Sequence, residues 1–129
     1  MEITSLNGQF VRVAVTEASC RELLGVVVGF VAAHRTIRVR VFDLTARAMV
    51  VVSLESCRHV PPENILHGVQ GLTATHPEFG PGEIISERRP RDVLLVQLVS
   101  DTGATSGWIP LAQVTITGAA HRANEAQVA

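Results

Sequence analysis

The sequence has no lysine and no tyrosine, and its aromatic residues are four Phe and one Trp. All 11 basic residues are therefore Arg, which favours bidentate contacts to carboxylate or phosphate wherever a site exists. Recognition of a methylated lysine needs several rings around one cation, and stacking of single-stranded bases needs exposed rings. The scarcity of aromatic residues argues against both activities.

A strong charge of one sign is also missing, since the net charge is −1. A general binder of nucleic acid or of membrane surfaces is usually strongly basic. The charge is nevertheless uneven, because residues 1–60 hold seven Arg against five acidic residues and the rest hold four against seven. A basic first half suits nucleic acid and an acidic second half suits a protein; the alternative is an ordinary charged surface.

Only two cysteines, Cys20 and Cys57, are present, far apart in sequence. No apolar N-terminal segment with a cleavage site appears, and the longest apolar stretch, residues 23–33, contains two glycines and is too short to cross a bilayer. We therefore expect a cytoplasmic protein without a membrane segment, whose thiols are reduced packing residues.

Motifs for catalysis and for metal binding are absent as well. Ser, His and Asp occur without a nucleophile elbow, and no glycine-rich phosphate loop precedes a helix. Cys57 and His59 are two residues apart, and Cys20, His34 and His67 could in principle complete a metal site, but structural zinc usually shows closely spaced ligand pairs. The sequence predicts a protein that is not an enzyme and holds neither cofactor nor metal.

What the sequence does contain is a series of short strand patterns, in a chain that is 47% hydrophobic. The clearest alternation places Ile37, Val39 and Val41 between Arg38 and Arg40. Short strands with frequent turns predict small barrels or sandwiches. The predicted strands are residues 11–15, 23–31 (bent or bulged at its glycines), 37–41, 48–54, 83–86, 93–99, 106–109 and 113–116.

The two halves match each other at one offset of about 57 positions. Gly25 corresponds to Gly82, and the segments 27–28, 37–41 and 52–54 correspond to 84–85, 94–98 and 109–111. Near the start the offset is about 63, which aligns Gly8 with Gly71. Alternation alone aligns any two β-rich segments, but the matched glycines and the constant offset favour a true internal repeat.

Pro61 and Pro62 mark the predicted domain boundary, because neither residue has an N–H group to donate to a strand partner. The predicted organisation is a first barrel at residues 1–62, a second barrel at 63–117 that begins with a connector at 65–70, and a flexible tail at 118–129.

The most distinctive motif is His76-Pro77-Glu78-Phe79-Gly80-Pro81-Gly82, followed by the strand-forming pair Ile84-Ile85. Gly80 and Gly82 are expected to permit a tight reversal. With Gly71 before it, and with Asp101-Thr102-Gly103, Trp108-Ile109-Pro110-Leu111 and Val114 after it, this motif resembles the C-terminal Tudor-like domain of bacterial UvrD-type repair helicases. The sequence departs from that family at residues 97–100, where the middle strand lacks the usual Phe.

This resemblance covers residues 71–117, about a third of the chain. Related barrels occur in CarD-type transcription factors and in RapA-type polymerase-associated ATPases, where they mostly dock on RNA polymerase. The resemblance implies an all-β fold of tandem small SH3/Tudor-like barrels and a partner in transcription or DNA-processing machinery, such as RNA polymerase or a helicase.

Two groups of Arg are candidate binding residues. Arg38 and Arg40 share the outward face of one strand, and Arg12 is expected to join them across the barrel. The hairpin at residues 87–92 carries the second group, Arg88, Arg89 and Arg91, which can reach phosphates or carboxylates. The alternative for both groups is a solvated surface with weak Arg–acid pairs.

Trp108 is the remaining candidate: it is expected in the core, and if it is exposed it becomes an interface anchor. The leading functional hypothesis is a protein-interaction adaptor that binds through exposed strand edges and hairpin tips. Direct nucleic-acid binding through the Arg residues is the second hypothesis. A structural or small-ligand barrel, of which a homodimer paired edge to edge is one form, is the third.

Overall fold

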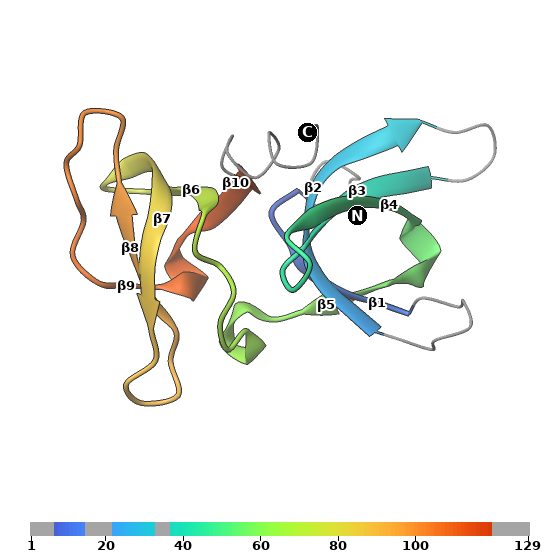
Figure 1. Cartoon of the computed structure of the whole chain (residues 1–129), viewed down its shortest axis with the longest axis horizontal. Helices are drawn as coiled ribbons and strands as arrows, with labels where there is room; N and C mark the ends of the chain where they lie inside the picture. The colour runs from blue at the N-terminus through green and yellow to red at the C-terminus, as the bar shows by residue number, and fades with distance from the viewer. Residues whose placement is uncertain (1–6, 15–21, 33–36, 120–129) are drawn as a thin grey trace. The chain divides into compact units, whose positions relative to one another are not determined.

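The computed structural model describes residues 7–14, 22–32 and 37–119, and these residues form an all-β structure (Figure 1). The chain divides into two compact units, Met1–Val60 and Pro61–Ala129. Each unit contains one five-stranded antiparallel sheet, so the predicted all-β class with two small barrel-like domains is confirmed. The division falls before Pro61, two residues earlier than the limit expected from the sequence.

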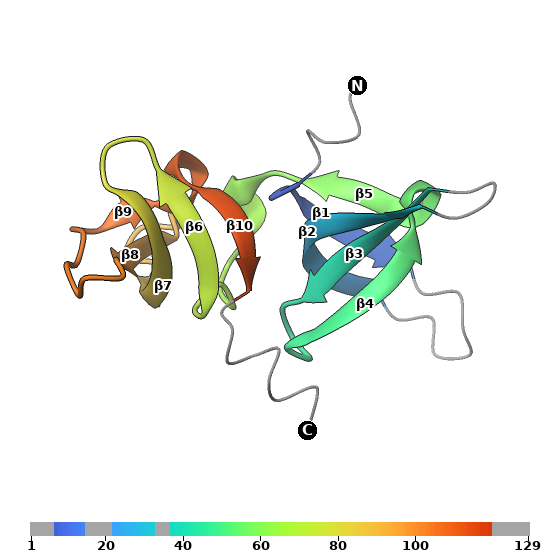
Figure 2. The ribbon, with the colours of Figure 1, turned by 90° about the horizontal axis from the view of Figure 1, so that it is seen from above.

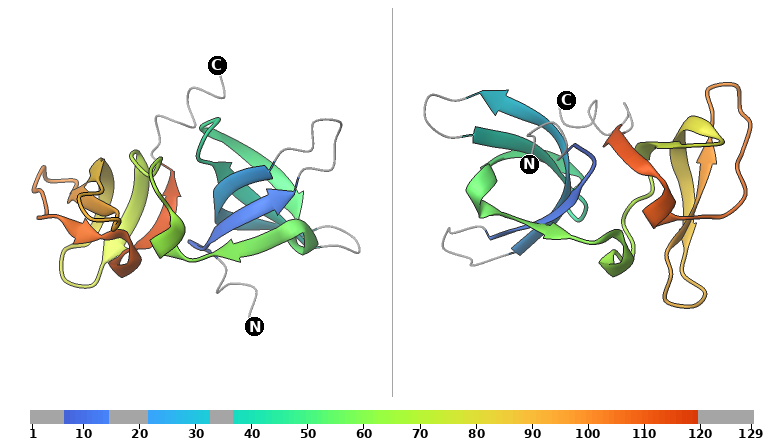
Figure 3. Two further views of the ribbon diagram at one scale, coloured as in Figure 1. Left: turned by 90° about the horizontal axis from the view of Figure 1, so that it is seen from below. Right: turned by 180° about the vertical axis from the view of Figure 1, so that it is seen from behind.

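The first sheet has the strand order β4-β3-β2-β1-β5 and curves around its own core, as Figure 2 and the right panel of Figure 3 show. Its core contains Val11, Val13, Val27, Val39 and Val41. The two valines of β1 and the two of β3 alternate with exposed residues, as a half-buried strand requires. The elements are β1 (Phe10–Ala14), β2 (Glu22–Ala32), β3 (Ile37–Asp43), β4 (Ala48–Ser53), the 3₁₀ turn η2 (Leu54–Ser56) and β5 (Cys57–Val60).

The second sheet has the order β10-β6-β7-β8-β9, and Leu72, Ile84 and Leu98 are among its fully buried residues. Ile65 and Val69 are also buried, so the segment expected to be a mere connector contributes to the core of this unit. The elements are η3 (Pro62–Asn64), β6 (Leu72–His76), β7 (Gly80–Arg88), β8 (Leu95–Val99), β9 (Ile109–Pro110), η4 (Leu111–Gln113) and β10 (Thr115–Ala119).

The two sheets repeat each other strand for strand, with the offset that the sequence shows. The ladder between β2 and β3 is interrupted by a bulge after Val27, and the ladder between β7 and β8 is interrupted after Ile84, 57 positions later. The 3₁₀ turns η2 and η4 also differ by 57 positions. A bulge bends the strand that carries it, so both sheets curve at the same place.

The start of each unit shows the larger offset. The N–H of Gly8 donates to the carbonyl of Val27 at 2.7 Å, and the N–H of Gly71 donates to the carbonyl of Ile84 at 2.8 Å. Gly8 and Gly71 have φ of 86° and 93°, a region that glycine adopts without steric cost. The glycine match read from the sequence thus marks the same hydrogen bond in both units.

The second matched glycine pair serves close packing within the sheets. A Cβ at Gly25 would lie 2.5 Å from the carbonyl oxygen of Phe42, and a Cβ at Gly82 would lie 2.8 Å from that of Val99. Gly82 lies within β7 and pairs with Ala74 of β6, so the prediction that it forms part of the tight turn was wrong. Gly80, with φ of 90°, ends that turn.

The turn itself joins β6 to β7 through residues 77–79, as the motif predicts. His76 Nδ1 accepts hydrogen bonds from the N–H groups of Glu78 (3.1 Å) and Phe79 (3.2 Å). The imidazole thus caps the turn, which gives the first residue of the motif a structural role.

Each of the eight predicted strands differs from the observed one by at least one residue, and β5 and β6 are not among the predicted ranges. Two of the differences concern the edge strands of the second unit. The strand expected at residues 106–109 is reduced to β9. Ser106 still binds β8, since its N–H donates to the carbonyl of Leu98 at 2.8 Å and its Oγ accepts from the N–H of Leu98 at 2.9 Å. Gly118 and Ala119 belong to β10, where a bulge after Ile116 keeps them paired with β6, and so they are not part of a tail. Residues 120–129 lie outside the described part of the chain.

Candidate interaction edge of the first barrel

Four strands lie at sheet edges, namely β4 and β5 in the first unit and β9 and β10 in the second. An edge strand presents N–H and C=O groups that can pair with another chain, and proteins usually protect such edges with charge, proline or bulges. Three of the four carry one of these protections. β5 exposes Arg58 and His59, β9 is two residues long and contains Pro110, and β10 is bulged.

β4 carries none of these protections. Its six residues, Ala-Met-Val-Val-Val-Ser, include no charge and no proline, and its pairing with β3 is uninterrupted. Val50 and Val52 pack against the core, while the side chain between them, Val51, is 46% exposed. Ile37, at the start of the adjacent strand β3, is 41% exposed. Within the described residues, β4 is the edge most open to an added strand.

The backbone groups of β4 that face this open edge follow from one hydrogen bond. The N–H of Leu44 donates to the carbonyl of Leu24 at 3.0 Å, so the backbone groups of Leu44 face β2. Successive residues of an antiparallel strand point their backbone groups to alternate sides. By this alternation, every second residue of β3 from Asp43 back to Val39 points its backbone groups toward β4. The residues of β4 opposite them bond back to β3, so the N–H groups of the residues in between, Met49, Val51 and Ser53, point away from β3 and toward the open edge.

Arg38 and Arg40, two of the residues predicted for binding, lie beside this edge. Arg40 is directly opposite Val51 and Arg38 is directly opposite Ser53, so both side chains share the outer face of β3 and β4. Both are exposed. The Cδ of Arg40 would lie 3.9 Å from a Cβ at Gly29, so the aliphatic part of this exposed side chain lies beside Gly29.

Arg12 does not join this pair. It is opposite Leu24 on β2, whereas Arg40 is opposite Gly29 on the same strand, a separation of five residues or about 16 Å along the strand. Arg12 Nε also forms an exposed ion pair with Glu22 at 3.3 Å. Such surface pairs contribute little to stability.

In the second unit, the end of β7 brings Arg88 to Trp108. The guanidinium carbon of Arg88 lies 4.5 Å from the centre of the indole ring, a cation–π contact. Trp108 is 38% exposed, so the expectation that it belongs to the core was wrong. Arg89 approaches Asp92 at 3.9 Å, and Arg91 is exposed.

Glu87, in the same hairpin, has a structural role that the sequence did not indicate. Its carboxylate accepts hydrogen bonds from three consecutive N–H groups, those of Gly68, Val69 and Gln70, each at 2.8 Å. Charge-assisted bonds of this kind are stronger than neutral ones. The carboxylate therefore fixes the segment that precedes β6 against β7.

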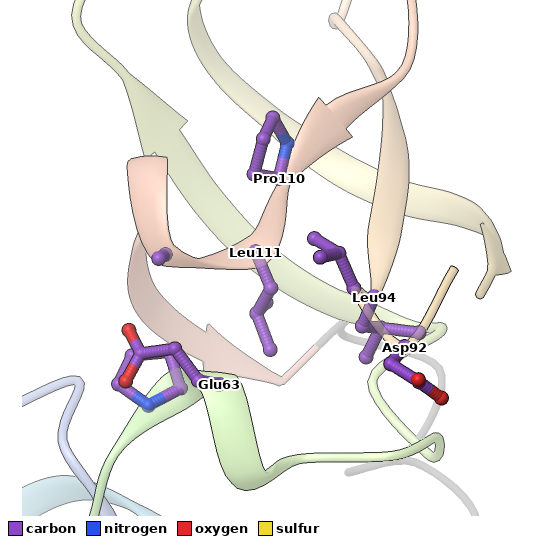
Figure 4. Close-up of a pocket in the computed structure, with 8 residues that line it drawn as sticks. Glu63, Asp92, Leu94, Pro110 and Leu111 are labelled. Atoms are coloured by element: carbon purple, nitrogen blue, oxygen red, sulfur yellow. The ribbon is translucent and has the colours of Figure 1, made fainter. Parts of the chain in front are cut away.

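The second unit also contains a shallow apolar hollow of about 50 Å³ (Figure 4). It lies between the hairpin at Asp92 and Leu94, the turn at Pro110 and Leu111, and Glu63. Sites for drug-sized molecules occupy roughly 300–1,000 Å³. The hollow has room for one side chain of a partner but not for such a ligand.

Other chemical features of the described residues are few. They contain no group of three or more side chains suited to a metal, and His59 Nε2 instead lies 2.9 Å from Gln9 Oε1. Cys20 and His34 lie outside the described residues. Burial raises the pKa of the half-buried Cys57 thiol, which keeps it protonated at neutral pH. No helix in residues 7–14, 22–32 and 37–119 is long and apolar enough to cross a membrane.

Comparison of the chain with protein-family models, with curated proteins and with solved structures finds no match.

Proposed function

We propose that this protein is a non-enzymatic interaction module whose first barrel binds an extended segment of a partner protein along β4. The observation that carries this proposal is the unprotected edge: six uncharged residues, with three outward N–H groups, in a sheet whose other edge is charged. Strand addition of this kind gains affinity from backbone hydrogen bonds and specificity from alternate side chains.

The proposed partner belongs to bacterial transcription or DNA-processing machinery, such as RNA polymerase or a helicase. The ground for this choice is the resemblance of residues 71–117 to Tudor-like domains of such proteins. The exposed Trp108 with its stacked Arg88 supplies a second contact surface for a large partner, since Trp and Arg are common interface anchors.

Ser53→Pro is the variant that tests the edge. Ser53 has φ of −72°, close to the −58° of Pro110 at the equivalent position of β9, so proline fits without strain. The change removes one outward N–H, and the new ring closes the end of the edge. We expect a loss of partner binding of at least about tenfold, measured against Ser53→Ala, which loses the hydroxyl but keeps the N–H.

The partner itself is sought by affinity capture from native lysate, with and without nuclease, read by mass spectrometry. Recovery of RNA polymerase or a helicase that survives nuclease and is lost with Ser53→Pro supports the proposal. Recovery that disappears with nuclease favours the alternative that Arg38 and Arg40, which are exposed together, bind nucleic acid.

A further inference from the structure

We infer that the segment bound by β4 alternates apolar and acidic residues, with its acidic side chains on the face of Arg38 and Arg40. This inference rests on the proposed function and adds the chemistry of the partner. Two observations carry it, one from each face of the β4 edge.

The inner face requires apolar residues. Val50 and Val52 pack against the core but are only half-buried, because no described strand pairs with the open edge of β4 beside them. Side chains of an added strand that lie beside Val50 and Val52 point to the same face, since directly paired residues share a face. An apolar residue at every second position would complete this side of the core.

The outer face requires negative charge. An added strand would lie about 10 Å from β3, two strand spacings away, and only the short side chains of Val51 and Ser53 would intervene. A guanidinium and a carboxylate reaching toward each other can span that gap. Among the described residues, neither Arg38 nor Arg40 forms an ion pair with a carboxylate of this chain. A partner residue opposite Val51 would meet Arg40, and one opposite Ser53 would meet Arg38.

A second copy of the chain fits this edge less well. If β4 paired with β4 of another copy, the side chains brought to the outer face would be Met49, Val51 and Ser53, none of which is charged. Arg38 and Arg40 would then gain no partner. Charge complementarity therefore favours a foreign acidic strand over self-association.

The test uses the full chain and two labelled peptides, one alternating Glu and Val and the other alternating Lys and Val, compared by fluorescence anisotropy. We expect the Glu peptide to bind several-fold to about tenfold more tightly. The double variant Arg38→Glu/Arg40→Glu should reverse this preference. Arg12→Glu/Arg58→Glu makes the same change of charge at exposed residues opposite each other on β1 and β5, and it should leave the preference unchanged.

Two further arms separate the inference from the proposed function. Ser53→Pro, and Glu peptides N-methylated at alternate amides, should both lose binding. Equal binding of the Glu and Lys peptides, with sensitivity to Ser53→Pro, would overturn the acidic preference and leave strand addition standing. Failure of both peptides, with partner capture also insensitive to Ser53→Pro, would overturn both. Binding of single-stranded oligonucleotides that is lost with Arg38→Glu/Arg40→Glu but unaffected by Ser53→Pro would replace the peptide with nucleic acid.

Discussion

Single glycines control how closely β2 and β7 approach their neighbours. Alanine at Gly25 or Gly82 would place a Cβ within 3 Å of a carbonyl oxygen in the adjacent strand, and backbone cannot move aside as a flexible side chain can. We expect each substitution to lower the free energy of unfolding by about 1–3 kcal/mol, measured by urea denaturation.

Gly107 provides the control for this pair, since a Cβ there would meet nothing within 4 Å. Gly107→Ala should change the free energy of unfolding by no more than about 0.5 kcal/mol. If Gly25→Ala or Gly82→Ala changed the free energy of unfolding as little as this, the adjacent strands would not approach these glycines as closely as described.

The Cys57 thiol gives a pH-dependent prediction. Because burial raises its pKa, the folded state holds the proton more tightly than the unfolded state does. The stabilisation associated with the neutral thiol is therefore complete below the pKa of the unfolded thiol, and it is lost as pH rises through the folded pKa. In a Cys20→Ser background, labelling of Cys57 at pH 7 should be much slower than labelling in denaturant, and it should accelerate as pH rises. Equal rates in both states would show an exposed thiol.

At the residue scale, the sequence showed which residues of the two halves correspond, but it did not show what each of those residues contacts. The match between Gly25 and Gly82 was correct, but Gly82 packs against β8 and does not turn the chain. Trp108 was expected in the core because apolar rings usually are. No pattern in the sequence shows that Arg88 lies over this ring, because that contact depends on where β7 ends.

Among the elements, the attachment of residues 68–70 to β7 depends on the Glu87 carboxylate. Glu87→Gln replaces one of the two acceptor oxygens with an NH2 group, so only one oxygen remains to accept from the three N–H groups of residues 68–70. We expect a loss of about 1–3 kcal/mol in unfolding free energy and faster amide exchange at residues 68–70. Glu78→Gln, at an exposed position, should change neither quantity. Unchanged exchange in Glu87→Gln would remove the carboxylate from this role.

Ser53→Pro also has an expected effect on stability. Its backbone already has φ of −72°, and proline restricts the unfolded chain more than serine does. The free energy of unfolding should stay the same or rise by up to about 1 kcal/mol, measured by thermal and urea unfolding. A large decrease would mean that the N–H of Ser53 points into the sheet.

Most strands could be predicted because alternation specifies both the element and the buried face, as it does in β3. The edge strands could not be ranked from the sequence, since strand order depends on long-range pairing. In retrospect one signal was present: Ser53 stands where the second half has Pro110. Only the register shows that this difference opens one edge and closes the other.

For the molecule as a whole, the net charge of −1 argues that the affinity for a partner depends only moderately on salt concentration. If two Arg residues face an acidic strand, the affinity for that strand should fall only a few-fold between about 50 and 200 mM salt. The affinity of a protein that contacts many phosphates falls by a factor of about 10³–10⁵ over the same range. Titration of the captured partner, or of the Glu peptide, at several salt concentrations measures this slope. A slope near that of a phosphate binder would contradict a protein partner.

The shared architecture of the two units was readable from the 57-residue offset, because glycines and bulges recur with the strands. The difference between the edge strands of the two units was not, because it depends on strand order and register. One sheet finishes in an uncharged edge and the other in a proline, so equivalent strands in the two units are suited to different tasks.

The unprotected edge of β4 also affects the tendency of the protein to aggregate, in cells and after purification. The strand addition proposed for β4 would also capture segments of unfolded or newly made chains, which are abundant during protein synthesis. On this proposal, protein produced in excess of the proposed partner is the form most prone to aggregate. Production together with the partner, in matched amounts, should yield more soluble material than production alone.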